Sequence, residues 1–254
     1  MCTVVVLIRP ENPWPVLIAA NRDEMADRPS KPPARHWEDR PDVVAGLDEL
    51  SGGTWLGLND YGVFACVLNR VGTLGPSRQY RTRGELPLEA LDHADAESAF
   101  EALRHLDPSA YRGFNLLIAD RKEAYWLYGS NDEDGAAVPH VGGGRIQPGL
   151  GMITAYGLND NSSARIRFHR PRFETAAVPD PESGDWAAWQ ALLASTEYEE
   201  GSAERGSMLI GDGTGFGTVS ASLIALPHLD RSGVEAQFLH APGRPGQTSF
   251  ASVL

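Results

Sequence analysis

Short apolar segments bounded by turn residues occupy both ends of the chain, and this pattern constrains its fold more than any other feature. Residues 3–8 (TVVVLI) are typical of a strand that is buried on both faces. A proline-rich turn follows, and residues 16–20 predict a second strand that forms a hairpin with the first. Further strands are predicted at 54–59, 63–69, 114–119, 124–128, 151–156, 207–210, 218–225 and 236–240.

Helical patterns lie between these groups of strands. Residues 85–106 predict one helix, or a pair interrupted near 93–95, and residues 163–173 and 185–193 predict two more, the last with Asp185 as its N-cap. Hairpins with separate helical stretches favour an α+β fold with helices outside packed sheets. The segment 28–48 is expected to be a long loop, and the glycines at 142–144 a flexible turn.

Length and charge restrict the class of protein. The 254 residues suffice for one soluble domain spanning 1–254. The formal net charge of −12 disfavours binding to nucleic acid, because the chain would repel a phosphate backbone. Two cysteines are too few for a disulfide framework, and no apolar run approaches the roughly 20 residues of a membrane span. We therefore expect a cytoplasmic protein without a transmembrane segment.

Cys2 is the residue with the most distinctive chemistry. It follows the initiator Met, and a small second residue allows an aminopeptidase to remove that Met. The exposed α-amine would titrate near ~8 and could accept the thiol proton while the thiolate attacks a carbonyl. One residue would then supply both nucleophile and base. Cys66, inside a predicted strand, is interpreted as a core residue.

Polar residues at strand ends are candidate partners of Cys2. The predicted hairpin brings residues 21–24 near it, and there Asp23 could orient the amine. Arg22 could lower the thiol pKa or bind a substrate carboxylate, and Asn21 is assigned with it to substrate binding. Asn69 carries an amide donor suited to an oxyanion. The scattered histidines show no metal-ligand spacing, so no metal or other cofactor is predicted.

Ordered motifs spread over the first half of the chain carry a resemblance to a known family. They are Met1-Cys2, Ala19-Ala20-Asn21-Arg22-Asp23-Glu24, Arg28-Pro29, Gly52-Gly53-Thr54-Trp55-Leu56-Gly57, Arg83-Gly84-Glu85-Leu86 and Gly113-Phe114-Asn115-Leu116. With these blocks the chain resembles the NRDE proteins, also called the transport and Golgi organisation protein 2 family. That family is similar to the N-terminal-nucleophile hydrolases, particularly to choloylglycine hydrolase and penicillin V acylase.

The resemblance implies a four-layer αββα sandwich of two antiparallel sheets. It also implies that Cys2 is the nucleophile, Asp23 its orienting acid and Asn69 an oxyanion donor. Two positions depart from the pattern of those hydrolases. Thr154 stands where a second Asn is expected, unless Asn159 replaces it, and Val219 stands where an Arg is expected.

Three functions follow from these observations. The first is a cysteine amidohydrolase or acyltransferase that acts on a small amide through Cys2. The second, implied by the family, is a non-enzymatic carrier in haem trafficking or acyl-lipid handling, to which the two departures give support. The third is a degenerate hydrolase fold kept for partner binding. The sequence identifies neither the substrate nor the oligomeric state.

Overall fold

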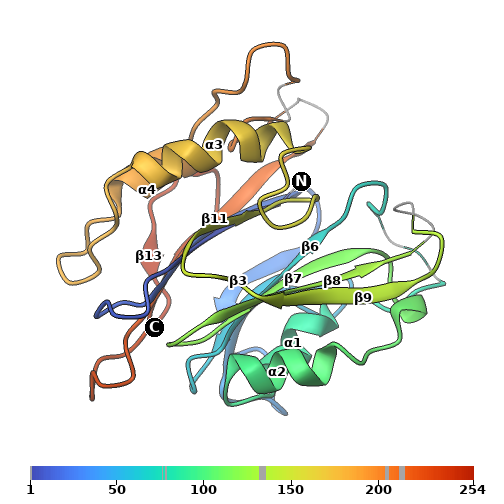
Figure 1. Ribbon diagram of the computed structural model, residues 1–254, viewed down its shortest axis with the longest axis horizontal. Coiled ribbons are helices and arrows are strands. Elements are labelled where there is room, and N and C mark those ends of the chain that lie inside the picture. Colours follow the sequence, from blue (N-terminus) through green and yellow to red (C-terminus); the bar gives the residue numbers. More distant parts are fainter. Residues whose placement is uncertain (1, 76, 78, 132–135, 204–205, 212–214) are drawn as a thin grey trace. The chain divides into compact units, whose positions relative to one another are not determined.

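The chain forms two compact units. The computed structural model describes residues 2–254 except 76, 78, 132–135, 204–205 and 212–214. One unit consists of residues 1–28 and 148–254, and the other of residues 29–147. Within the described residues, each unit contains one antiparallel sheet and two α-helices (Figure 1). The predicted α+β class with two antiparallel sheets is confirmed, whereas the single domain over 1–254 stays a prediction.

The sheet of the first unit contains the N-terminal hairpin. In the order in which they pair, its strands are β10 (Gly149–Ile153), β1 (Thr3–Ile8), β2 (Val16–Met25), β11 (Phe216–Leu226), β12 (Gln237–Ala241) and β13 (Ala251–Ser252). The predicted hairpin is confirmed, with Thr3 opposite Asn21 and Ile8 opposite Val16. β2 is longer than predicted because residues 21–25 continue it by pairing with β11.

Two helices cover one face of this sheet. They are α3 (Ala164–Thr175), which contacts β10, and α4 (Ala187–Leu193), which contacts β2, and they lie side by side in Figure 1. Leu17 and Ala19 share a core with Trp186 and Trp189, so alternate residues of β2 face the helices. Asp185 accepts a hydrogen bond from the Ala187 N–H at 3.0 Å, one position before the N-cap of α4.

The strand predicted at 207–210 is wrong. Met208 and Ile210 are buried as expected of a strand, but the backbone of this segment makes single hydrogen bonds to separate partners. These include the Thr218 N–H, which donates to the Ile210 carbonyl, and the Ser195 carbonyl, which accepts from the Leu209 N–H. The Met208 carbonyl accepts from Asn21 Nδ2 at 3.0 Å, and the Ile210 N–H donates to Thr218 Oγ1 at 2.9 Å. Its apolar residues therefore fill a core without forming a ladder.

The second unit contains a sheet in which the strands pair in sequence order. They are β3 (Ser30–Ala34), β4 (Val43–Asp48), β5 (Leu56–Asn59), β6 (Phe64–Asn69), β7 (Phe114–Ala119), β8 (Ala124–Ser130) and β9 (His140–Arg145). The long loop predicted at 28–48 is wrong, because β3 and β4 lie within it. Val43 and Val44 pair with β5, and Pro32 and Pro33 are tolerated because β3 is an edge strand.

The glycine turn predicted at 142–144 is also wrong, since these residues lie inside β9, the opposite edge strand. Gly142 pairs with Tyr128 of β8, and a Cβ at Gly142 would lie 2.6 Å from the Tyr128 hydroxyl oxygen. The tyrosine ring therefore covers the space that a side chain on β9 would need.

Two helices pack on one face of the second sheet. They are α1 (Glu85–Leu91) and α2 (Ala96–Leu103), so the predicted pair interrupted near 93–95 is confirmed. Asp95 caps α2 by accepting from the Ser98 N–H at 2.7 Å. Phe100 and Leu116 belong to the core between these helices and the sheet. No helix among the described residues is both long and apolar enough to cross a membrane.

Two of the motif glycines pack backbone against backbone in this unit. A Cβ at Gly53 would lie 2.5 Å from the carbonyl carbon of Gly84, and the Thr54 N–H donates to the Gly84 carbonyl at 2.8 Å. Arg83 Nη1 also donates to the Gly113 carbonyl at 2.9 Å. Three motif blocks that lie far apart in the sequence thus meet in one place.

Gly53→Ala is expected to lower the free energy of unfolding by about 1–3 kcal/mol, because its methyl group would overlap a backbone that cannot move cheaply. The measurement is urea denaturation of the variant and the parent protein. Gly144→Ala is the matched control, since no atom lies within 4 Å of the added Cβ. Equal losses in the two variants would contradict the explanation.

Candidate functional site

Cys2 lies beside the polar end of β2, as the hairpin predicts. Thr3 pairs with Asn21, so the preceding Cys2 reaches the next residues of β2. The Cys2 thiol donates to the backbone carbonyl of Asp23, with 3.6 Å between Sγ and O. The prediction that residues 21–24 lie near Cys2 is confirmed.

Asp23 is held by partners from two other elements. Its side chain is completely buried. Oδ1 accepts from Thr218 Oγ1 at 2.7 Å, and Oδ2 accepts from Arg165 Nη1 at 3.1 Å. Thr218 lies opposite Asp23 on β11, whereas Arg165 belongs to the first turn of α3. Both carboxylate oxygens are therefore fixed by donors on separate elements.

Arg165 is a site residue that sequence analysis missed. Arg165, His169 and Phe173 are spaced by four residues and are all buried, so they lie on the inner face of α3. An arginine in register with an apolar helix face was the signal that could have found it. The Arg165 side chain is 3% exposed and pairs with Asp23, as buried charges in proteins usually pair with an opposite charge.

The surroundings of Cys2 favour its neutral thiol. Burial raises the pKa of the Cys2 thiol, and the nearby Asp23 carboxylate raises it further. The hydrogen bond to the Asp23 carbonyl and the Arg22 guanidinium act in the opposite direction. Because the raising effects are larger, formation of a thiolate at neutral pH requires a nearby proton acceptor.

Asn21 connects β2 to the helical layer. Its carboxamide is buried, and Nδ2 donates to the backbone carbonyls of Leu193 at 2.9 Å and Met208 at 3.0 Å. Both amide hydrogens are thereby used within the protein. These contacts give Asn21 a structural role, and its assignment to substrate binding stays a prediction.

Arg22 points to the other face of the sheet. Asn21 and Asp23 face the helices, so the alternation of β2 directs Arg22 away from them. Burial, together with the Arg22 guanidinium, lowers the pKa of His240 to about 4. Cys2, which precedes the helix-facing Thr3, shares the face of Arg22. The choice between substrate binding and thiol activation by Arg22 stays open.

Asn69 belongs to the unit of residues 29–147. It is the last residue of β6 and lies opposite Phe114 of β7, so its predicted position at a strand end is confirmed. The next residue, Arg70, donates to Asn115 Oδ1 at 3.1 Å and stacks over the Tyr128 ring at 5.3 Å. The role of Asn69 as an oxyanion donor stays a prediction.

The two departures from the hydrolase pattern have local structural consequences. Thr154 Oγ1 contacts Ser163 Oγ at 3.3 Å, next to the start of α3. Asn159 has a φ of 54°, and its Oδ1 accepts from the Met152 N–H at 2.9 Å, so its carboxamide oxygen braces β10. β11 carries Val219 at the position where the hydrolase pattern has an arginine. In this chain an arginine of α3, Arg165, contacts Asp23.

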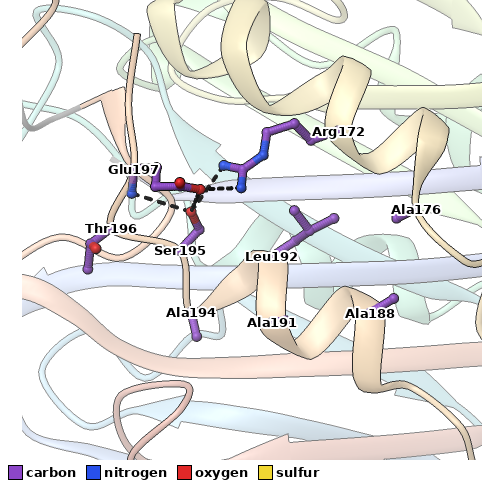
Figure 2. A pocket seen from close by; sticks show the side chains of 9 residues that line it. All are labelled: Arg172, Ala176, Ala188, Ala191, Leu192, Ala194, Ser195, Thr196 and Glu197. Carbon is purple, nitrogen blue, oxygen red and sulfur yellow. Dashed lines mark hydrogen bonds and ion pairs between the residues drawn. The ribbon is translucent and has the colours of Figure 1, made fainter. Parts of the chain in front are cut away.

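A pocket of about 440 Å³, which Figure 2 shows, is lined by none of these residues. It is lined by Arg172, Ala176, Ala188, Ala191, Leu192, Ala194, Ser195, Thr196 and Glu197. Arg172 pairs with Glu197 and donates to Ser195 Oγ at 3.2 Å, so the charged groups on its wall pair with each other. Among the described residues, no three or more His, Cys, Asp or Glu side chains are grouped closely enough to hold a metal ion.

Comparison with sequences identifies relatives of the chain. The profile of the family described as Transport and Golgi organisation 2 matches residues 1–201. The Transport and Golgi organization protein 2 homolog of Homo sapiens is 34% identical over 133 residues, which cover 49% of this chain and 47% of that protein. The homolog of Bos taurus is 32% identical over 146 residues, 52% of this chain and 51% of that protein. The chain thus spans about half the length of these curated relatives.

Solved structures of hydrolases have a similar fold. Penicillin V acylase from Agrobacterium tumefaciens superposes with a TM-score of 0.51 at 16% identity, covering 95% of this chain and 83% of the acylase. An N-acylethanolamine-hydrolyzing acid amidase ortholog from Caenorhabditis elegans gives 0.54 at 12% identity, with coverage of 87% and 92%. The C2A mutant of the conjugated bile acid hydrolase from Clostridium perfringens gives 0.54 at 12% identity, with coverage of 99% and 92%.

Proposed function

Because the chain belongs to the Transport and Golgi organisation 2 family and has the fold of N-terminal-nucleophile hydrolases, we propose that it is a cysteine amidohydrolase or acyltransferase. Its nucleophile is the Cys2 thiol, and its substrate is a small amide. One observation carries the proposal: the thiol lies against Asp23, whose carboxylate is held in place by Thr218 and Arg165.

The proposed reaction begins after removal of Met1. The α-amine of Cys2 accepts the thiol proton, and the sulfur attacks the amide carbonyl to form a C–S bond. The resulting oxyanion requires hydrogen-bond donors, the role predicted above for Asn69. The C–N bond then breaks, and the leaving amine takes the proton from the ammonium. Water, or a second amine in acyl transfer, attacks the thioester and releases the thiol.

Asp23 would act on the α-amine and not on the substrate. A carboxylate beside the N-terminus can accept hydrogen bonds from the ammonium and orient the amine toward the thiol. The raised pKa of the Cys2 thiol fits this scheme, because a neutral thiol needs a base at the moment of attack. Arg22, on the same face of the sheet as Cys2, is proposed to bind an anionic group of the substrate.

The names of the structural neighbours support this reaction class. They include an acylase, an acid amidase and a conjugated bile acid hydrolase, and the mutant of the last replaces a cysteine at position 2. Identities of 11–16% establish similarity of fold alone, so the chemistry of this chain rests on its own residues. We propose a cytoplasmic location on the low cysteine content.

Cys2→Ala is expected to abolish acylation, with a loss of at least about 10³-fold in rate, because no other group replaces the sulfur. Intact-protein mass before and after incubation with penicillin V reports both Met1 removal and a covalent adduct. Cys66→Ala is the control, since Cys66 is buried within β6 and should leave the adduct unchanged. An adduct that survives in Cys2→Ala would refute the proposed nucleophile.

The same experiment distinguishes the proposed amidohydrolase or acyltransferase from the alternative function, a non-enzymatic carrier. A chain that retains Met1, or a free Cys2 that resists acylation, would favour the carrier of haem or acyl lipid. Absorbance titration with haemin would then test ligand binding directly, because axial ligation shifts the haem spectrum.

A further inference from the structure

We propose that Arg165 is a positioning residue for Cys2, which holds the Asp23 carboxylate and the first residue of β1 in one fixed arrangement. The inference rests on the proposed role of Cys2 and adds a residue on α3 to the control of that site. It concerns the orientation and ionisation of the thiol, and Arg165 itself need not touch the substrate.

The argument begins with a closed ring of contacts. Arg165 Nη1 donates to Thr3 Oγ1 at 2.6 Å and to Asp23 Oδ2 at 3.1 Å. Thr3 is bonded covalently to Cys2, and the Cys2 thiol donates to the Asp23 carbonyl. The arginine therefore closes a ring that passes through both strands of the N-terminal hairpin and back to the thiol.

Burial makes this ring rigid. The Arg165 side chain is 3% exposed and that of Asp23 is 0% exposed, so neither group can exchange its partner for water. Ser163 caps α3 by accepting from the Ile166 N–H at 3.4 Å, which fixes the turn that carries Arg165. The start of α3 thus fixes the position of the guanidinium. Through its hydrogen bond to Thr3, the guanidinium in turn fixes the start of β1.

The charge of Arg165 also opposes the effect of Asp23 on the thiol. An unneutralised carboxylate beside Cys2 would raise the thiol pKa and would keep a neighbouring α-amine protonated. The charged groups that act on the Cys2 thiol are Asp23 and Arg22 of β2 and the N-terminus; Arg165 of α3 pairs with Asp23, and His240 of β12 adjoins Arg22. On β11 the neighbouring group is the Thr218 hydroxyl.

The test measures alkylation of Cys2 by iodoacetamide as a function of pH, with peptide mass spectrometry to separate Cys2 from Cys66. In Arg165→Met we expect the midpoint of the profile to rise by about one pH unit, and the rate below it to fall about tenfold. Arg165→Lys keeps the charge, so the pH midpoint of its alkylation profile is expected to stay close to that of the parent protein. Arg167→Met, on the same helix and paired with exposed Glu199, is the matched control.

A folded Arg165→Met protein with the parental midpoint and plateau rate would overturn the proposal. If that variant does not fold, Thr3→Val decides: it breaks the link to Arg165 without changing charge. We expect an unchanged midpoint and a plateau rate altered at least about threefold, and an unaltered plateau would overturn the proposal. The readout needs no substrate, so hydrolysis that survives in Cys2→Ala would refute the proposed function while leaving this result standing.

Discussion

Asp23→Ala is expected to lower the free energy of unfolding by about 3–5 kcal/mol, because it leaves the buried Arg165 guanidinium without its carboxylate. Thr218 would lose its acceptor at the same time. Denaturation by urea, followed by circular dichroism, measures the loss. Asp27→Ala is the control, since Asp27 is exposed, lies two residues beyond the end of β2 at Met25, and should change stability by no more than about 0.5 kcal/mol.

A double-mutant cycle measures the interaction energy between Asp23 and Arg165 separately from their contacts with the rest of the site. Arg165→Met alone leaves a buried carboxylate, whereas Asp23→Ala with Arg165→Met leaves neither charge. We expect the double variant to be more stable than the sum of the single losses predicts, by about 2 kcal/mol or more. Additive losses would mean that the two side chains do not stabilise each other, and would contradict the arrangement described above.

Acid is expected to destabilise the unit of residues 1–28 and 148–254 through two buried histidines. Burial, with help from nearby Arg172, lowers the pKa of His169 to about 4, and burial with Arg22 does the same for His240. Both folded-state values lie below the unfolded value of about 6.5, so the unfolded chain binds protons first. The contribution of the two neutral histidines to the free energy of unfolding is therefore fully present above about pH 6.5. It is lost as the pH falls, and the loss is complete near pH 4. Each histidine accounts for about 3 kcal/mol.

Burial disfavours the charged ring and keeps these histidines neutral, whereas the hydrogen bond of His169 to the Glu197 carbonyl acts in the opposite direction. His169 Nε2 lies 3.0 Å from the Glu197 carbonyl, and its buried Nδ1 has no hydrogen-bond partner among the described residues. His240 Nδ1 lies 3.0 Å from Ser222 Oγ. A second proton on the His169 ring would therefore lack an acceptor among the described residues.

Urea denaturation at pH values from about 7 to 4 measures this dependence. The variant carrying both His169→Gln and His240→Gln is expected to lose less stability over that interval than the parent protein. His105→Gln, an exposed position, is the control and should keep the parental slope. A parental slope in the double variant would show that other groups carry the acid sensitivity.

Local sequence patterns were sufficient to predict the helices and strands that bury a clear apolar face. The N-terminal hairpin, the interrupted helix pair α1 and α2, and the strands β7 and β8 follow from apolar periodicity and turn residues. The nearness of Cys2 to residues 21–24 followed from the hairpin alone, because antiparallel pairing brings its far ends together. The motifs in the first half of the chain are sufficient to indicate the family.

The edge strands and the partners of Asp23 were decided only by tertiary structure. β3 contains two prolines and β9 three glycines, so each is stabilised by the strand beside it and not by its own propensity. Arg165 lies 142 positions from Asp23 in the sequence, and no local rule relates the two. The sequence by itself thus determined the hairpin and the position of Cys2 beside residues 21–24. The fold alone brought a helix arginine to the carboxylate, because a buried charge takes whichever partner the packing places within reach.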